Sequence, residues 1–159
     1  MGIGTKTVCH ISFVVKDIDK TVENWAAFLG IDMPRIWNIP KPEEAPALTD
    51  GKLEDYSDCR ISVIEMDNLV LEFVQPGERT SPWKTWMEKN GEGFQHMAFV
   101  VEDREKAKQL IRNEFGVDGW YHIGYYRAEH MRSMTRKKRL QRKSILRTIR
   151  TTVRSSRSF

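Results

Sequence analysis

The chain has few cysteines and no long apolar run. Cys9 and Cys59 are the only two in 159 residues, so at most one disulfide is available. Because the strand pattern puts Cys9 on an apolar face, we expect reduced thiols. No segment approaches the roughly 20 apolar residues of a membrane helix, and the N-terminus lacks the apolar core of a signal peptide. These absences predict a cytoplasmic protein with no membrane partner.

Acidic residues are missing from the end of the chain, with no Asp or Glu between His130 and Phe159. Residues 1–126 carry 14 basic and 21 acidic side chains (net −7), whereas residues 127–159 carry 12 basic and one acidic (net +11), which together give +4. An acidic body argues against a nucleic-acid-binding core, and leaves only non-specific contacts of the basic segment with nucleic acid. We expect this segment to be irregular or loosely helical and open to trypsin.

What the chain does have is an internal repeat. HISFVVKDIDKT, which starts at His10, aligns without a gap on HMAFVVEDREKA, which starts at His96. The offset of 86 residues continues to LGID, which ends at Asp32, and FGVD, which ends at Asp118. A repeat of this length indicates that one supersecondary unit is used twice.

Each copy begins with an alternating strand followed by an amphipathic helix. His10 and His96 lie on the strand face opposite the bulkier apolar residues. An acidic residue precedes each helix and a glycine follows it, as expected for an N-cap and a left-handed C-cap. These residues are Asp17 and Gly30 in the first copy and Asp103 and Gly116 in the second.

The first copy continues into three more strands. PRIWNIP is followed by a Pro-rich loop from Pro40 to about Asp58, and then by RISVIEM and LVLEFVQ, which a tight turn at Asp67 and Asn68 joins. Ser81 is the expected N-cap of a short helix that starts with proline. The predicted organisation is a first βαβββ module (7–78), a linker with a short helix (79–94), an incomplete second module (95–126) and a basic tail (127–159).

Three side chains are candidate metal ligands: His10, Glu72 and His96. Glu72 alternates with Val70 and Val74, so its carboxylate extends from an apolar strand, where an uncompensated charge is costly. A divalent cation bound by two imidazoles and a carboxylate removes that cost. A single histidine on a strand is usually a core or surface residue. The duplication at equivalent positions is therefore what favours a site.

These motifs resemble the vicinal oxygen chelate superfamily, the group of glyoxalase I, methylmalonyl-CoA epimerase, extradiol dioxygenases and bleomycin-resistance proteins. The resemblance covers roughly residues 7–126 and is carried by HISFVVKDIDKTVENWAAFLGI, LVLEFVQP and GEGFQHMAFVVED. It implies an α+β fold of two tandem βαβββ modules with curved mixed sheets, here with a second module incomplete at its C-terminal end. By position, the implied ligands of a divalent ion (Zn, Ni, Co, Mn or Fe) are His10, Glu72 and His96.

The same resemblance implies a function. GEGFQHMAF after a short Trp-containing helix is most similar to methylmalonyl-CoA epimerase and glyoxalase I. The implied activity is that of a metal-dependent isomerase, epimerase or lyase, which acts on a small carbonyl or acyl-thioester substrate through an enediolate. A homodimer is the expected assembly. No general base can be assigned, because the acidic candidates are better interpreted as surface charges. These candidates are Glu43, Glu44, Glu54 and Glu65.

The chain departs from the family at the fourth ligand, a glutamate on the last strand of the second module. No acidic residue occurs from about position 140 onward, and SILRTIRTTV is the only strand-like pattern there. We therefore expect any metal to be held weakly. Two alternatives follow: a non-catalytic small-molecule-binding module, as in bleomycin-resistance proteins, or an inactive truncated or frame-altered family member.

Overall fold

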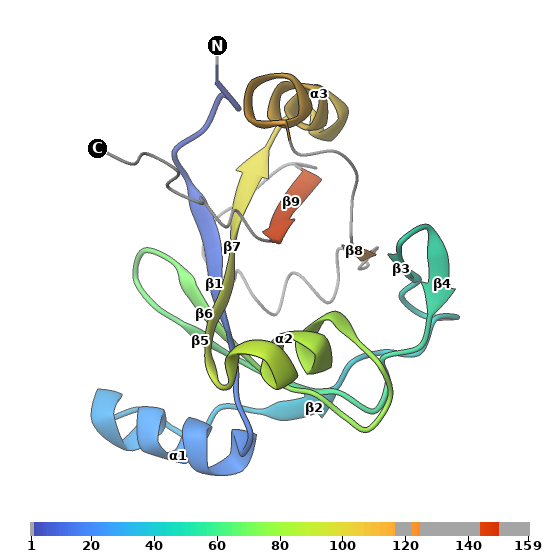
Figure 1. Cartoon of the computed structure of the whole chain (residues 1–159). Helices are drawn as coiled ribbons and strands as arrows, with labels where there is room; N and C mark the ends of the chain where they lie inside the picture. Colours follow the sequence, from blue (N-terminus) through green and yellow to red (C-terminus); the bar gives the residue numbers. More distant parts are fainter. Residues whose placement is uncertain (1, 117–121, 125–143, 150–159) are drawn as a thin grey trace, which may run out of the picture.

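The computed structural model describes residues 2–116, 122–124 and 144–149 (Figure 1). Within them, no helix is both long and apolar enough to cross a membrane. The elements are β1 (Val8–Val14), α1 (Ile18–Leu29), β2 (Ile36–Asn38), β3 (Ala47–Thr49), β4 (Lys52–Glu54), β5 (Arg60–Glu65), β6 (Val70–Gln75), α2 (Pro82–Asn90), β7 (Gly93–Val101), α3 (Arg104–Phe115), β8 (His122–Gly124) and β9 (Ser144–Ile149).

The main sheet has six strands in the order β2-β5-β6-β1-β7-β9. The first strands of the two modules, β1 and β7, pair antiparallel at its centre, while β1 and β6 pair parallel. Figure 1 shows β1 and β7 side by side, with α1 near one end of the pair and α3 near the other. The α+β fold class with mixed sheets and a βαβββ first module is confirmed.

The helices begin and end where the capping signals predict. Asp17 accepts a hydrogen bond from the backbone N–H of Lys20 (3.0 Å), and Gly30 takes the left-handed conformation at φ 64°. The second copy repeats this arrangement, with Asp103 as N-cap and Gly116 at φ 62°. A repeated cap pair therefore sets both helix lengths.

Apolar residues cover both faces of the first module's sheet. On one face, α1 buries Ile18 and Val22 against Phe73 of β6. On the other face, Trp83 of α2 is buried in a cluster that includes Val14, and its ring meets that of Tyr56 edge to face at 5.5 Å. The side chains of the candidate ligands belong to this second face, together with Val14 on β1.

The expected Pro-rich loop contains a hairpin that the sequence analysis did not predict. Strands β3 and β4 pair antiparallel, and Asp50 and Gly51 between them have φ values of 48° and 76°. Two consecutive positive φ values are typical of the tight turns that join β-strands, and Asp-Gly is a preferred sequence for them. The dipeptide Asp50-Gly51 is therefore the sequence signal for this hairpin.

Strand β8 lies 86 residues after β2, since Ile36 and His122 differ by the repeat offset. The two strands nevertheless have different partners. Strand β2 pairs with β5 of its own module, whereas β8 pairs antiparallel with β3 in a separate sheet of order β4-β3-β8. The hairpin inserted in the first module thus binds the second module's second strand.

The expectation of an irregular tail is wrong for the six residues of β9. These residues pair antiparallel with β7, with His96 opposite Ile149. The outer edge of β7 offers unpaired backbone groups, and Ser144–Ile149 includes two isoleucines and a threonine, which favour strands. Residues 127–143 and 150–159 lie outside the described part of the chain, so the rest of the tail prediction stays a prediction, as do the domain boundaries.

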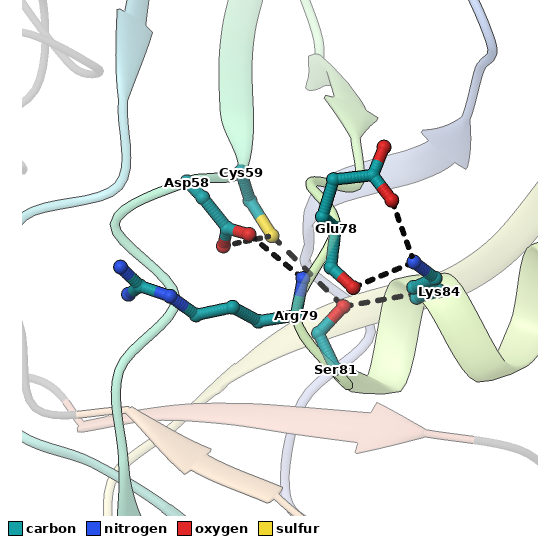
Figure 2. A network of polar contacts seen from close by, with 6 residues as sticks. All are labelled: Asp58, Cys59, Glu78, Arg79, Ser81 and Lys84. Carbon is teal, nitrogen blue, oxygen red and sulfur yellow. Dashed lines mark hydrogen bonds and ion pairs between the residues drawn. The ribbon is translucent and has the colours of Figure 1, made fainter.

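A polar network fixes the segment between β6 and α2 (Figure 2). The Asp58 carboxylate accepts a hydrogen bond from the backbone N–H of Arg79 (2.9 Å), and Ser81 caps α2 by accepting from the N–H of Lys84 (3.0 Å). Cys59 lies 3.9 Å from the Ser81 hydroxyl, and burial raises the pKa of its thiol. The protonated thiol can therefore donate to Ser81.

Position 77 requires glycine because Asp58 lies too close to it to leave room for a Cβ. A Cβ at position 77 would overlap the Asp58 carboxylate and lie 2.6 Å from the Asp58 carbonyl oxygen. We expect Gly77→Ala to lower the free energy of unfolding by about 1–3 kcal/mol, the usual cost of overpacking. Gly2→Ala is the control, because its added Cβ meets nothing within 4 Å. Urea unfolding of both variants measures the difference, and equal midpoints would contradict the expected clash.

Candidate metal centre

The structure brings together the three side chains that the sequence analysis selected. The Nε2 atoms of His10 and His96 are 3.0 Å apart, and each lies 3.9 Å from Oε1 of Glu72. Within the described residues, this is the one group of at least three His, Cys, Asp or Glu side chains placed to hold a metal ion. The repeat therefore places residues 86 positions apart in direct contact.

All three side chains are almost fully buried. The exposed fractions are 5% for His10, 1% for Glu72 and 2% for His96. A carboxylate removed from water is costly unless a nearby positive charge or strong hydrogen bonds compensate it. A cluster of this kind stabilises a cation and keeps bulk water away from it.

Strand register explains why the three groups meet. Ser12 on the central strand β1 lies opposite Glu72 on β6 and opposite His96 on β7, so these residues form one row across three strands. His10 is two residues before Ser12 and therefore shares its face. The parallel pairing of β1 with β6 and the antiparallel pairing of β1 with β7 together build the site.

The pairing of β1 and β7 contains two irregularities at equivalent positions. Its register shifts by one residue at Cys9, between Val8 and His10, and again at Gln95, since Ser12 faces His96 but Phe13 faces Phe94. Cys9 and Gln95 each precede a candidate ligand and differ by the repeat offset. An extra residue in one strand bends it and redirects side chains, so each module adjusts its strand beside its histidine.

The donor set fits a divalent transition metal. Two nitrogens that bind one ion at about 2.0–2.1 Å lie about 2.9–3.4 Å apart when the angle at the ion is about 90–109°. The observed distance between the Nε2 atoms is 3.0 Å. The carboxylate distances of 3.9 Å are longer, but together with the 3.0 Å separation they leave one point about 2.1 Å from all three donor atoms, so Glu72 can bind the same ion without a change in its side-chain torsions. Two imidazoles and one carboxylate suit Zn, Ni, Co, Mn or Fe better than Mg or Ca.

The second module does not supply a counterpart of Glu72 in the part of the chain that is described. Strand β9 occupies the position beside β7 that β6 occupies beside β1, but it runs antiparallel instead of parallel. Its residues, SILRTI, include no acid. Within these residues the candidate site therefore has three protein donors, and its fourth position is open to water or to a substrate.

No general base is identified among the acidic residues that the sequence analysis considered. Glu43, Glu44 and Glu65 are exposed, and Glu54 is half-buried. They belong to the loop, to β4 and to the end of β5. Their interpretation as surface charges stays the simplest one.

Two further residues, which the sequence analysis did not select, lie at the site. Alternation along β1 places Ser12 on the face of His10 but predicts no role for it, although Ser12 is completely buried. Its hydroxyl has no hydrogen-bond partner among the described residues. Gln95 accepts a hydrogen bond from Nδ1 of His96 (2.8 Å), and it lies at a register shift that alternation does not predict.

Comparison with known proteins agrees with this architecture. The family model of the Glyoxalase/Bleomycin resistance protein/Dioxygenase superfamily matches residues 9–125. Curated protein sequences gave no match.

Solved structures of similar fold include several methylmalonyl-CoA epimerases. The enzyme from Mycobacterium tuberculosis is 17% identical with a TM-score of 0.47; the alignment covers 69% of this chain and 64%, less than two thirds, of that one. A Streptomyces coelicolor variant in complex with 2-nitronate-propionyl-CoA is 24% identical with a TM-score of 0.50, with 70% of each chain covered. A complex of such an epimerase with methylmalonyl-CoA and ammonium has the same identity and TM-score, with 70% of this chain and 71% of that one covered. At these identities the likeness shows the fold.

The buried hydroxyl of Ser12 leads to a stability prediction. A buried hydroxyl without a partner destabilises a protein, so we expect Ser12→Ala to raise the free energy of unfolding of the metal-free protein by roughly 1 kcal/mol. Ser62 is the matched control, because it is equally buried on β5 but donates to the Arg35 carbonyl oxygen at 2.9 Å. Ser62→Ala should lower the same free energy by roughly 1 kcal/mol. Denaturant unfolding without metal tests both, and a loss of stability in both variants would contradict the view that the Ser12 hydroxyl has no partner in the described part of the folded protein.

Proposed function

Because the chain belongs to the glyoxalase/bleomycin resistance protein/dioxygenase superfamily, we propose that it is a divalent-metal-dependent isomerase, epimerase or lyase. Its substrate would be a small molecule with a carbonyl or acyl-thioester group. The observation that carries this proposal is the buried cluster of His10, Glu72 and His96, whose donor atoms face one another.

Each residue of the cluster has a distinct part in holding the ion. His10 and His96 offer neutral nitrogen donors through Nε2, and Glu72 offers the negative charge that offsets part of the charge of the cation. A bound divalent ion would polarise the substrate carbonyl and so make the adjacent C–H more acidic. Ser12 lies in the same row and has a hydroxyl that can donate to a substrate oxygen.

The surroundings of the cluster favour proton transfer over hydrolysis. Because the cluster side chains are at most 5% exposed, a substrate bound there replaces the remaining water. Electrostatic interactions strengthen when water is excluded. An acyl-CoA thioester is the first substrate to test, since the structures of similar fold include an epimerase bound to methylmalonyl-CoA.

A non-catalytic binding module is the second candidate function. It is favoured by β9, which occupies the place of the closing strand but brings no carboxylate to the described part of the site. A protein with three donors and no positioned base can bind a small molecule without converting it. Proton exchange on a candidate substrate separates the two functions.

The proposed setting is a cytoplasmic homodimer. Cys9 and Cys59 are both reduced thiols in the described structure, which suits a reducing compartment. Phe28 on α1 and Phe115 on α3 are exposed on the described surface, and they are candidate contacts for the proposed dimer.

Metal binding is the first test of the proposal. We expect the protein to bind one Co²⁺ or Zn²⁺ ion per chain and to lose part of it during dialysis, since the described residues supply no fourth ligand. Glu72→Gln preserves the shape but removes the negative donor, and should weaken binding at least about tenfold, which is about 1.4 kcal/mol. Glu65→Gln, an exposed change on β5, is the control and should bind normally. Titration calorimetry measures both, and equal affinities would contradict the role of Glu72.

Proton exchange is the second test. In D₂O with added Co²⁺, we expect the protein to incorporate deuterium at the carbon next to the thioester of methylmalonyl-CoA. His96→Gln should abolish the incorporation, whereas Glu65→Gln should retain it. Mass spectrometry of the recovered thioester gives the result. Binding of the thioester to the metal-loaded protein without incorporation would support the binding module instead.

A further inference from the structure

Gln95 is a buried amide on β7 that connects the candidate metal centre to α2. Its side chain is 4% exposed. The carboxamide Oε1 lies 2.8 Å from Nδ1 of His96, and its Nε2 donates to the carbonyl oxygen of Pro82 at 3.3 Å. Adjacent residues of a regular strand face opposite sides, so the register shift at Gln95 accounts for the contact of its side chain with the neighbouring His96.

The chemistry of these groups fixes the direction of each hydrogen bond. The Pro82 carbonyl can only accept, so the amide NH₂ of Gln95 must face it. The amide oxygen then faces His96, and an oxygen of this kind can only accept. Nδ1 of His96 must therefore carry a hydrogen, and in a neutral imidazole this leaves the lone pair on Nε2.

We propose that Gln95 is a positioning residue that holds His96 in the Nδ1–H tautomer and directs its Nε2 lone pair into the cluster. In the metal-free protein this lone pair accepts a hydrogen bond from Nε2–H of His10, at the observed 3.0 Å. When an ion binds, the same lone pair is the donor, so His96 needs no change of tautomer, whereas His10 must move its hydrogen from Nε2 to Nδ1 to become a donor. The value of this arrangement for metal binding rests on the proposed function, but the tautomer itself does not.

The anchor of Gln95 is itself held in place. Pro82 is the first residue of α2, whose N-cap Ser81 is fixed by the network around Asp58 and Cys59. Figure 2 shows Ser81 at the start of the helix, with Asp58 and Cys59 close by. The position of the Pro82 carbonyl, and through Gln95 the orientation of the His96 ring, therefore depends on the loop before α2.

The tautomer can be measured directly in metal-free protein. Long-range ¹H–¹⁵N correlation spectra of protein labelled at histidine distinguish a protonated Nδ1 from a protonated Nε2. We expect His96 to be Nδ1–H in the wild type and in Gln95→Glu, which retains an acceptor oxygen. Gln95→Met removes that acceptor and should shift His96 toward the Nε2–H form. Gln75→Met is the matched control, because Gln75 accepts from the backbone N–H of Ile18 and does not contact a histidine in the described structure.

Metal titration separates this inference from the proposed function. Loss of a group that orients a histidine ligand typically weakens metal binding about 10–100-fold. We expect a loss of this size for Gln95→Met with Zn²⁺, near wild-type binding for Gln75→Met, and recovery in Gln95→Glu. A wild-type His96 with hydrogen on Nε2, or spectra of Gln95→Met identical to the wild type, would overturn the inference. The expected tautomer without any Zn²⁺ binding would support the role of Gln95 and count against the metal-dependent function.

Discussion

The antiparallel pairing of β1 with β7 is the interaction on which the candidate site depends. It joins the first strands of two modules that are 86 residues apart in sequence, and so places His10 and His96 within 3.0 Å of each other. The parallel neighbour β6 then brings Glu72 to the same row. Each of these residues alone is an ordinary strand residue. Only this order of strands brings the three side chains together.

The electrostatics of the cluster constrain the rest of that face. A carboxylate and two imidazoles are buried together, which is costly unless their charges and hydrogen bonds are balanced. Gln95 supplies part of the balance through His96, and Ser12 keeps a hydroxyl in the same row. Polar groups thus replace apolar packing at the centre of the sheet, where packing alone would give more stability. This exchange of stability for polarity is typical of binding and catalytic sites.

Sequence reasoning identified features that depend on local patterns. Alternation located β1 and β7, and the cap pair of Asp17 and Gly30 located α1. The repeat alone points to His10 and His96, because a duplicated histidine is a signal that one copy does not give. The contact between Gln95 and His96 was not predictable, since a one-residue register shift has no sequence signature. The antiparallel pairing of β9 with β7 was not predictable either, because it depends on the edge of a strand that lies far away in the sequence.

The small sheet of β4, β3 and β8 has a consequence for the order of folding. Strands β3 and β4 are joined by the two-residue turn at Asp50 and Gly51, so their pairing is local and fast. Strand β8 joins them only when His122 meets Thr49, which closes a much longer loop. The entropy of that closure is lost before the new hydrogen bonds stabilise the chain. The pairing of β3 with β8 is therefore expected to form late, after β1 and β7 have already brought the two modules together.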